Sequence, residues 1–232
     1  MGIGLRGPAR VRYDPSVASV LCCLLAVLLA GSAAAGFEQA LDPRSIDEAV
    51  AVGRARIEAV RARFHQPYRI PIGQAPVDYI DIVTPFRRVV LLAEGRAQVG
   101  DRLFGQREAI AALGDRAALV EVLVEMTFHP LNVFVGVPAY DVELATASPA
   151  GQIEPLQISR IPRFGARVEG VPAPSPFPGA ANVPGLSQPL AGGTISAGFG
   201  AGTLNPNGVY DVVVREQGTE LARARVDLGA LR

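Results

Sequence analysis

The chain has 232 residues, which is enough for one domain with an appendage but too few for a large multidomain protein. Hydrophobic residues make up 49% and charged residues 19% of the sequence, so wholesale disorder is excluded. The 22 basic residues are all arginine and are balanced by 22 acidic residues. No global basic field exists, and we expect no nucleic-acid partner.

The first 35 residues have the pattern of a secretory signal peptide. Three arginines, at positions 6, 10 and 12, precede the apolar run 17–30, and the small residues 31–35 follow it. We predict cleavage after Ala35, because signal peptidase accepts small side chains in an A-x-A pattern. The alternative is an uncleaved membrane anchor, since residues 17–35 come close to the roughly 20 apolar residues that span a bilayer.

Both cysteines of the chain, Cys22 and Cys23, lie inside the predicted signal peptide. The mature chain is therefore expected to have no disulfide and no thiolate zinc site. We expect an exported protein, periplasmic or secreted, that touches a membrane only if the signal segment is kept. The lysine-free composition, rich in alanine and arginine, is typical of a bacterium with a GC-rich genome.

The hydrophobic pattern that follows predicts one long amphipathic helix over residues 41–64. Ser45 and Glu48 have the spacing of a capping box at its start. His65 stands at its end, where a histidine commonly satisfies the last carbonyls of a helix. The helix is expected to pack its apolar stripe on a larger body.

A strand is predicted over residues 77–83, which are rich in β-branched and aromatic side chains. Thr84 then caps a second helix that begins at Pro85. A short third helix is predicted over residues 106–113, ended by Gly114.

From residue 119 the hydrophobic period changes to two, and residues 119–128 form the clearest predicted strand. Further strands are predicted over residues 140–144, over 155–160 and from about residue 193, with a proline-rich loop over 171–189.

The last two predicted strands form a hairpin around Gln217 and Gly218. The register expected from this turn pairs Arg215 with Glu220, Val213 with Ala222 and Val209 with Val226. It also places Asp211 on the apolar face, which conflicts with burial of that face.

These elements predict an α+β fold in which N-terminal helices precede an antiparallel, immunoglobulin-like β-sandwich. The expected organisation is a signal peptide over 1–35, a mainly helical region with one strand over 36–118, and the sandwich over 119–232.

Acidic residues and one histidine share a predicted strand face, formed by Glu121, Glu125 and His129. If this strand pairs with residues 140–145, Asp141 and Glu143 join the same face. Such a cluster could hold Ca²⁺ or Zn²⁺, or raise the pKa of a carboxylate for general-base work. The alternative is an ordinary wetted sheet face. No metal-binding or serine-hydrolase motif is present, so no catalytic residue, metal ligand or cofactor is assigned.

The segment 129–138 is unusually apolar for a connection between strands. One interpretation is a further buried strand over 133–137, favoured by its β-branched residues. The other is that Phe134 and Val135 are exposed and bind a partner, because exposed apolar patches often mark interfaces.

We expect a non-enzymatic binding or assembly module of the cell envelope, whose partner is an envelope protein or a glycan. The predicted sandwich offers edges and loops for partners, and no catalytic motif is present. The alternatives are an extracytoplasmic hydrolase that uses carboxylates on a sheet face, and a membrane-tethered accessory subunit that retains residues 17–35.

Overall fold

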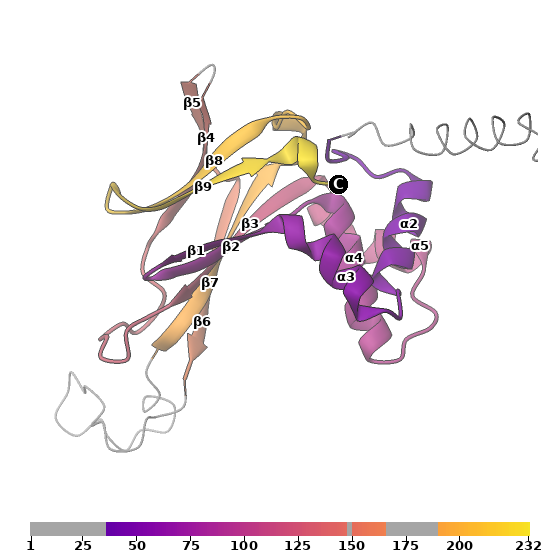
Figure 1. The fold of residues 1–232 in the computed structure, drawn as a ribbon, viewed down its shortest axis with the longest axis horizontal. Coiled ribbons are helices and arrows are strands. Elements are labelled where there is room, and N and C mark those ends of the chain that lie inside the picture. The colour runs from indigo at the N-terminus through magenta and orange to yellow at the C-terminus, as the bar shows by residue number, and fades with distance from the viewer. Residues whose placement is uncertain (1–35, 148–149, 166–189) are drawn as a thin grey trace, which may run out of the picture. The chain divides into compact units, whose positions relative to one another are not determined.

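The structure is a computed structural model that describes residues 36–147, 150–165 and 190–232. Helices and two antiparallel sheets make up this part of the chain (Figure 1), so the α+β class is confirmed. The predicted signal peptide 1–35 and the predicted proline-rich loop 171–189 lie outside the described residues. None of the helices in the described ranges is long and apolar enough to cross a membrane.

Nine strands of the described residues form the two sheets. The five-stranded sheet has the order β1 (Arg69–Gln74), β2 (Val77–Val83), β3 (Leu119–Thr127), β7 (Leu190–Gly200) and β6 (Gln157–Phe164). The four-stranded sheet has the order β5 (Ala150–Ile153), β4 (Asp141–Ala147), β8 (Val209–Glu216) and β9 (Thr219–Asp227). The chain changes sheet after β3, after β5 and after β7, so neither sheet comes from one continuous part of the sequence.

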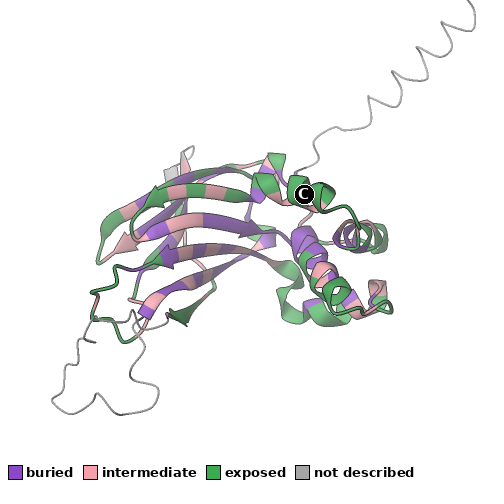
Figure 2. Ribbon diagram, turned by 60° about the horizontal axis from the view of Figure 1, so that its bottom comes forward, coloured by how far each residue is buried: buried purple, intermediate pink, exposed green. Residues whose placement is uncertain are grey.

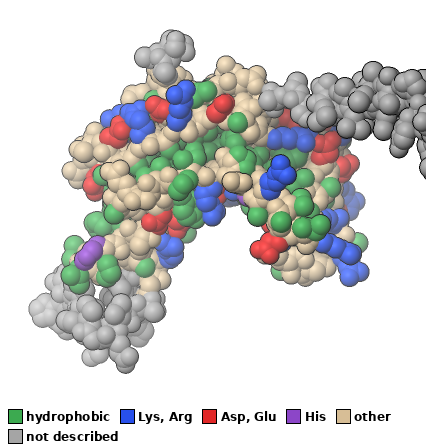
Figure 3. All heavy atoms as spheres, viewed as in Figure 1, with side chains coloured by type: hydrophobic (Ala, Val, Ile, Leu, Met, Phe, Trp, Pro, Cys, Tyr) green, Lys and Arg blue, Asp and Glu red, His purple; other side chains and the backbone are tan. Residues whose placement is uncertain are grey.

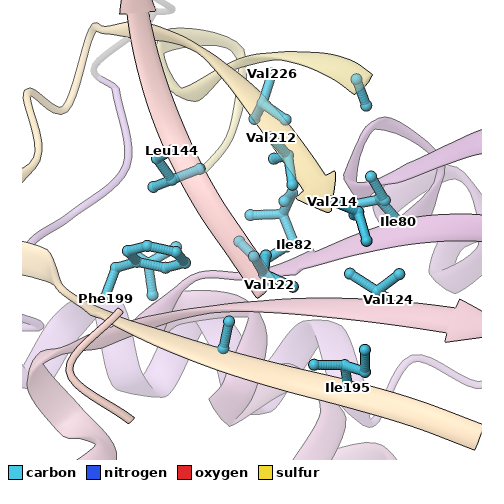
Figure 4. Packing of buried hydrophobic residues seen from close by; sticks show 14 of the residues in the cluster. Ile80, Ile82, Val122, Val124, Leu144, Ile195, Phe199, Val212, Val214 and Val226 are labelled. Atoms are coloured by element: carbon cyan, nitrogen blue, oxygen red, sulfur yellow. The ribbon is translucent and has the colours of Figure 1, made fainter. Parts of the chain in front are cut away.

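One hydrophobic core lies between the facing sides of the two sheets (Figure 4). Val122 and Val124 enter it from β3, and Val212 and Val214 enter it from β8. Figure 2 shows buried positions alternating with more exposed ones along the strands, as the period of two predicts. All residues of this core and of the smaller helical core lie between Phe37 and Leu231, so the chain from Gly36 onward contains the whole hydrophobic interior of the described fold.

The sheets begin earlier in the sequence than residue 119. β2, the strand predicted over 77–83, pairs with β3 and places Tyr79 opposite Glu125. β1 was missed by the sequence pattern, because Pro71 interrupts it. Proline is tolerated there, since β1 is an edge strand with a partner on one side.

The helices lie at one end of the sheets (Figure 1). Their bounds are α2 (Pro43–Gly53), α3 (Glu58–His65), α4 (Pro85–Gln98) and α5 (Gln106–Leu113), and short 3-10 helices span Gln66–Tyr68, Gly114–Ala118, Ala201–Thr203 and Leu228–Ala230. Helices α2, α4 and α5 bury a second, smaller core that includes Phe86 and Phe104. The predicted cap of α4 by Thr84 and the predicted bounds of α5 are confirmed.

The single helix predicted over residues 41–64 is wrong, because the chain leaves the helix after Gly53 and re-enters one at Glu58. Gly53 lies in close contact with α4. A Cβ atom added there would lie 2.4 Å from the carbonyl oxygen of Val90. Beyond the break Ile57 and Val60 are exposed, and Phe64 at the end of α3 packs against the cores.

The predicted capping box at the start of this helix is also wrong. Asp42 is the N-cap, and its side chain accepts a hydrogen bond of 2.7 Å from the backbone N–H of Ser45. Glu48 instead forms ion pairs with Arg44 and Arg232. The cap therefore lies three residues before the predicted one, with proline at the first helical position.

The C-terminal hairpin forms around Gln217 and Gly218 as predicted, and both residues have positive φ. Its register differs, because a β-bulge in β9 leaves Leu221 as an extra residue between Glu220, which faces Arg215, and Ala222, which faces Val214. Arg215 faces Glu220 as predicted, but Val213 faces Arg223, Val214 faces Ala222 and Tyr210 faces Val226. The slip by one residue turns Asp211 to the outer side, where it pairs with Arg223 at 3.0 Å.

Candidate functional site

The acidic residues that were predicted to cluster lie on two different sheets. Glu121 and Glu125 are on β3, whereas Asp141 and Glu143 are on β4. The predicted pairing of these two segments is wrong, because β3 pairs with β2 and β7, and β4 pairs with β5 and β8. The inner faces of both sheets meet in the core, so the two pairs of acids point away from each other.

Three of these carboxylates each have an arginine beside them. The ion pairs are Glu121 with Arg88 at 3.1 Å, Glu125 with Arg163 at 3.1 Å and Glu143 with Arg215 at 2.9 Å. Throughout residues 36–147, 150–165 and 190–232, no group of three or more His, Cys, Asp or Glu could hold a metal ion. The acids therefore act as counter-charges, spread over the two outer faces.

Arg88 gives Glu121 a structural role. The Arg88 side chain is 8% exposed, and its Nη2 lies 3.1 Å from Glu121 Oε2. Its Nη1 donates to the carbonyl oxygens of Arg116 and Leu119, which links α4 to the start of β3. Burial lowers the pKa of Arg88, and the charge of Glu121 opposes that shift. A carboxylate that compensates a buried cation is poorly suited to accept a proton from a substrate.

His65 lies in a polar network between the helices and the five-stranded sheet. Arg87 donates from Nε to His65 Nδ1 at 3.3 Å, and arginine has no acceptor, so the ring proton lies on Nε2. That nitrogen lies 3.0 Å from Glu94 Oε2. Both ring nitrogens are used, in contacts with side chains and not with the helix-end carbonyls that the sequence suggested. His65 therefore has no nitrogen available as a general base.

His129 lies just beyond the end of β3 and is exposed. Its Nδ1 accepts a hydrogen bond of 3.2 Å from the backbone N–H of Leu131. This contact shapes the following loop. Among the contacts of the described residues, none joins the imidazole to Glu121, Glu125, Asp141 or Glu143, the four acids predicted to lie near it.

A hollow of about 510 Å³ lies on the outer face of the five-stranded sheet, beside residues 114–118. Its walls are formed by Asp115, Arg116, Leu119, Glu121, Leu123, Gln157, Ile158, Ser159, Ile161 and Ser196. The volume is in the range of small-ligand sites. The lining includes no aromatic ring on which a sugar could stack, and the charge of Glu121 is already compensated by Arg88. The hollow thus presents aliphatic, serine and glutamine surface together with the charged side chains of Asp115 and Arg116.

The apolar segment between β3 and β4 is an exposed loop, and the buried strand expected over 133–137 does not form. Leu131 is 63% exposed, Val133 75%, Phe134 40% and Val135 90%. Figure 3 shows hydrophobic side chains gathered around a histidine at the tip of this loop. We call residues 129–135 the loop tip. Its four large apolar side chains form an exposed group. Of the two interpretations of this segment, a buried strand or an exposed surface, the structure has the exposed one.

Two anchors hold the loop tip in place. The ring of Phe134 packs edge-on against the buried Phe128, with ring centroids 5.2 Å apart. Asn132 Nδ2 donates to the carbonyl oxygen of His129 at 2.7 Å and to that of Leu190 at 2.8 Å. The apolar side chains are therefore presented by an ordered loop, which lowers the entropy that binding must offset.

Comparison with known proteins finds no match for this chain among family models, curated proteins or solved structures. The choice of a functional surface consequently depends on the geometry and chemistry of the described residues.

The hollow is the feature that sequence reasoning missed. Its lining comes from residues 115 and 116 and from β3, β6 and β7, and these strands are far apart in the sequence. A partial signal exists on β3, where Leu123 lies between Glu121 and Glu125 and is an apolar residue on the face predicted to be wet. The partners of that face could not be found without the strand order.

Proposed function

We propose that this protein is an exported, non-enzymatic binding or assembly module of the cell envelope that docks through the loop tip. The observation that carries the proposal is the group of four exposed apolar side chains held on an anchored loop. Leaving such a group in water is unfavourable, and a partner that covers it gains from its burial.

The charged residues favour binding over catalysis. A hydrolase using carboxylates on a sheet face needs acids that converge in an enclosed cleft. Here Glu121, Glu125 and Glu143 are each paired with arginine, and Glu143 lies on a different sheet from the other two. No contact among the described residues supports the hydrolase alternative.

The type of partner follows from the type of surface. Three aliphatic side chains and one phenylalanine, in a segment without a charged residue from Pro130 to Tyr140, suit a protein or another apolar surface better than a glycan, which needs many hydrogen bonds. The immunoglobulin-like topology is also part of the proposal. It is supported by the repeated change of sheet along the chain and by the shared core of the two sheets.

Export is tested by the intact mass of the protein recovered after expression in a bacterium with a secretion pathway. We expect a product that begins at Gly36. A product that keeps residues 17–35 would favour the membrane-tethered accessory subunit, and a full-length cytoplasmic product would contradict export.

Docking through the loop tip is tested by a photo-crosslinking amino acid placed at Val135 in the native envelope. The matched control is Val99, which is 78% exposed at the end of α4 and lies outside the loop tip. Adducts at position 135 and none at position 99 are expected. Equal labelling at both positions, or none at 135, would contradict the proposal.

A further inference from the structure

We propose that the loop tip docks on a lipid bilayer and inserts Leu131, Val133, Phe134 and Val135 into its interfacial region. This inference rests on the proposed function, because it names the partner of the same surface. A protein partner is the competing occupant, and the experiment below separates the two.

The composition of the loop suits an apolar phase. From Pro130 to Tyr140 the sequence contains no charged residue. The four apolar side chains lie on a loop that connects two strands and are between 40% and 90% exposed, so contact with a flat bilayer needs no complementary groove. Amphipathic helices that lie on membranes bury their apolar face only about 5–10 Å deep, in the boundary between headgroups and acyl chains.

Part of the backbone of the loop tip is hydrogen-bonded within the tip itself. Three backbone N–H groups find acceptors within the tip: Leu131 N–H donates to His129 Nδ1 at 3.2 Å, Asn132 N–H to His129 O at 2.9 Å, and Phe134 N–H to Asn132 Oδ1 at 3.0 Å. A backbone group without a partner is costly in hydrocarbon. These three N–H groups would therefore keep a partner if the tip entered the interface.

Charge at the base of the loop complements lipid headgroups. Arg160 of β6 is exposed, and its Nη2 donates to the carbonyl oxygen of Tyr140, where the loop returns to β4. Arg160 forms no ion pair with any described residue. Ile161 and Phe164, also on β6, are exposed as well. Once the tip has entered the interface, an arginine at the base of the loop can extend toward headgroup phosphates.

The first test is flotation of the chain from Gly36 with vesicles of phosphatidylcholine, alone and mixed equally with phosphatidylglycerol. We expect binding that is stronger with the anionic mixture. Val135→Asp should weaken the apparent affinity by about tenfold or more, because a charge replaces a side chain that would enter the interface. Val99→Asp, the same change at an exposed valine outside the tip, should leave it unchanged.

A second readout uses the absence of tryptophan from the sequence. In Val135→Trp the added fluorophore should shift to the blue on vesicles and be quenched by brominated lipid, whereas in Val99→Trp it should show neither change. Val135 is almost fully exposed, so both substitutions at this position should preserve the melting temperature, which checks folding.

The inference is overturned if the unsubstituted chain does not float with either vesicle, or if Val99→Asp weakens flotation as much as Val135→Asp. If vesicles fail while crosslinks from position 135 reach a defined protein, the lipid partner is wrong and the docking function stands. If both experiments fail, the proposed function is wrong as well.

Discussion

The buried ion pair between Asp81 and Arg87 offers a quantitative test of how the helices are joined to the five-stranded sheet. Arg87 Nη1 donates to Asp81 Oδ1 at 2.6 Å, and Nη2 donates to Oδ2 at 3.1 Å. The side chains are 3% and 10% exposed, for Arg87 and Asp81 respectively. Nη1 also donates to the carbonyl oxygen of Ile82 at 2.6 Å, and Nε reaches His65. The guanidinium is thus fixed on α4 with its counter-charge on β2.

We expect Asp81→Asn to destabilise the protein strongly, because it leaves the Arg87 charge buried without a carboxylate. Removing one partner of a buried pair typically costs about 3–5 kcal/mol. For a chain of this size, each kcal/mol lowers the melting temperature by roughly 2–4 °C, so a fall of about 6–20 °C is expected. The double variant Asp81→Leu with Arg87→Met should recover most of this loss, since apolar replacements of a buried pair are often neutral.

The assay is thermal and urea unfolding of the chain from Gly36 near neutral pH. Arg69→Ala is the matched control, because Arg69 lies 3.4 Å from the same carboxylate but is half exposed, and should cost less than about 1 kcal/mol. A fall below about 2 °C in Asp81→Asn, or equal falls in this variant and Arg69→Ala, would refute the buried pair.

Three further changes probe packing, turn geometry and titration. Gly53→Ala should destabilise by roughly 1–3 kcal/mol in urea unfolding, because its Cβ would meet the Val90 carbonyl, whereas Gly95→Ala has free space and should not. Gln217→Asn should raise the unfolding free energy by about 0.5–1 kcal/mol, because Gln217 has a φ of 48°. The pKa of Asp42 is lowered, mainly by its capping hydrogen bond, so its contribution is present above about pH 4 and is lost as pH falls further. Melting temperatures between pH 5 and pH 2.5 should therefore fall less steeply in Asp42→Asn, and equal slopes would contradict this role.

Local rules explain which elements the sequence could predict. The start of α4 depends on Thr84 and Pro85, which are adjacent, and the Thr84 side chain accepts the hydrogen bond from Arg87 N–H as the pattern requires. The end of α5 depends on Gly114, whose φ is positive. In both cases the residues that determine the boundary lie within one helical turn of it, so no knowledge of tertiary contacts is needed.

Tertiary contacts explain where prediction failed. The apolar spacing through Gly53 and Ile57 is helical, but close packing of α2 on α4 and the turn that follows change the direction of the chain. The bulge at Leu221 of β9 is equally invisible in the alternating pattern, although Asp211 on the predicted apolar face was a sign of it. A polar residue in conflict with the predicted face was a reason to shift the register by one residue.

The same limit applies to the functional surface. A strand pattern shows which residues share a face but not which strand lies beside them, so Glu121 and Glu143 were grouped although β3 and β4 belong to different sheets. The loop tip was more accessible to prediction, because exposure of Val135 depends on the local absence of a strand partner. An apolar stretch between two strands has two stable outcomes, burial as a strand or exposure on a loop. Here the side chains of His129 and Asn132 take up backbone N–H groups that a strand would pair with a neighbour, which favours the loop.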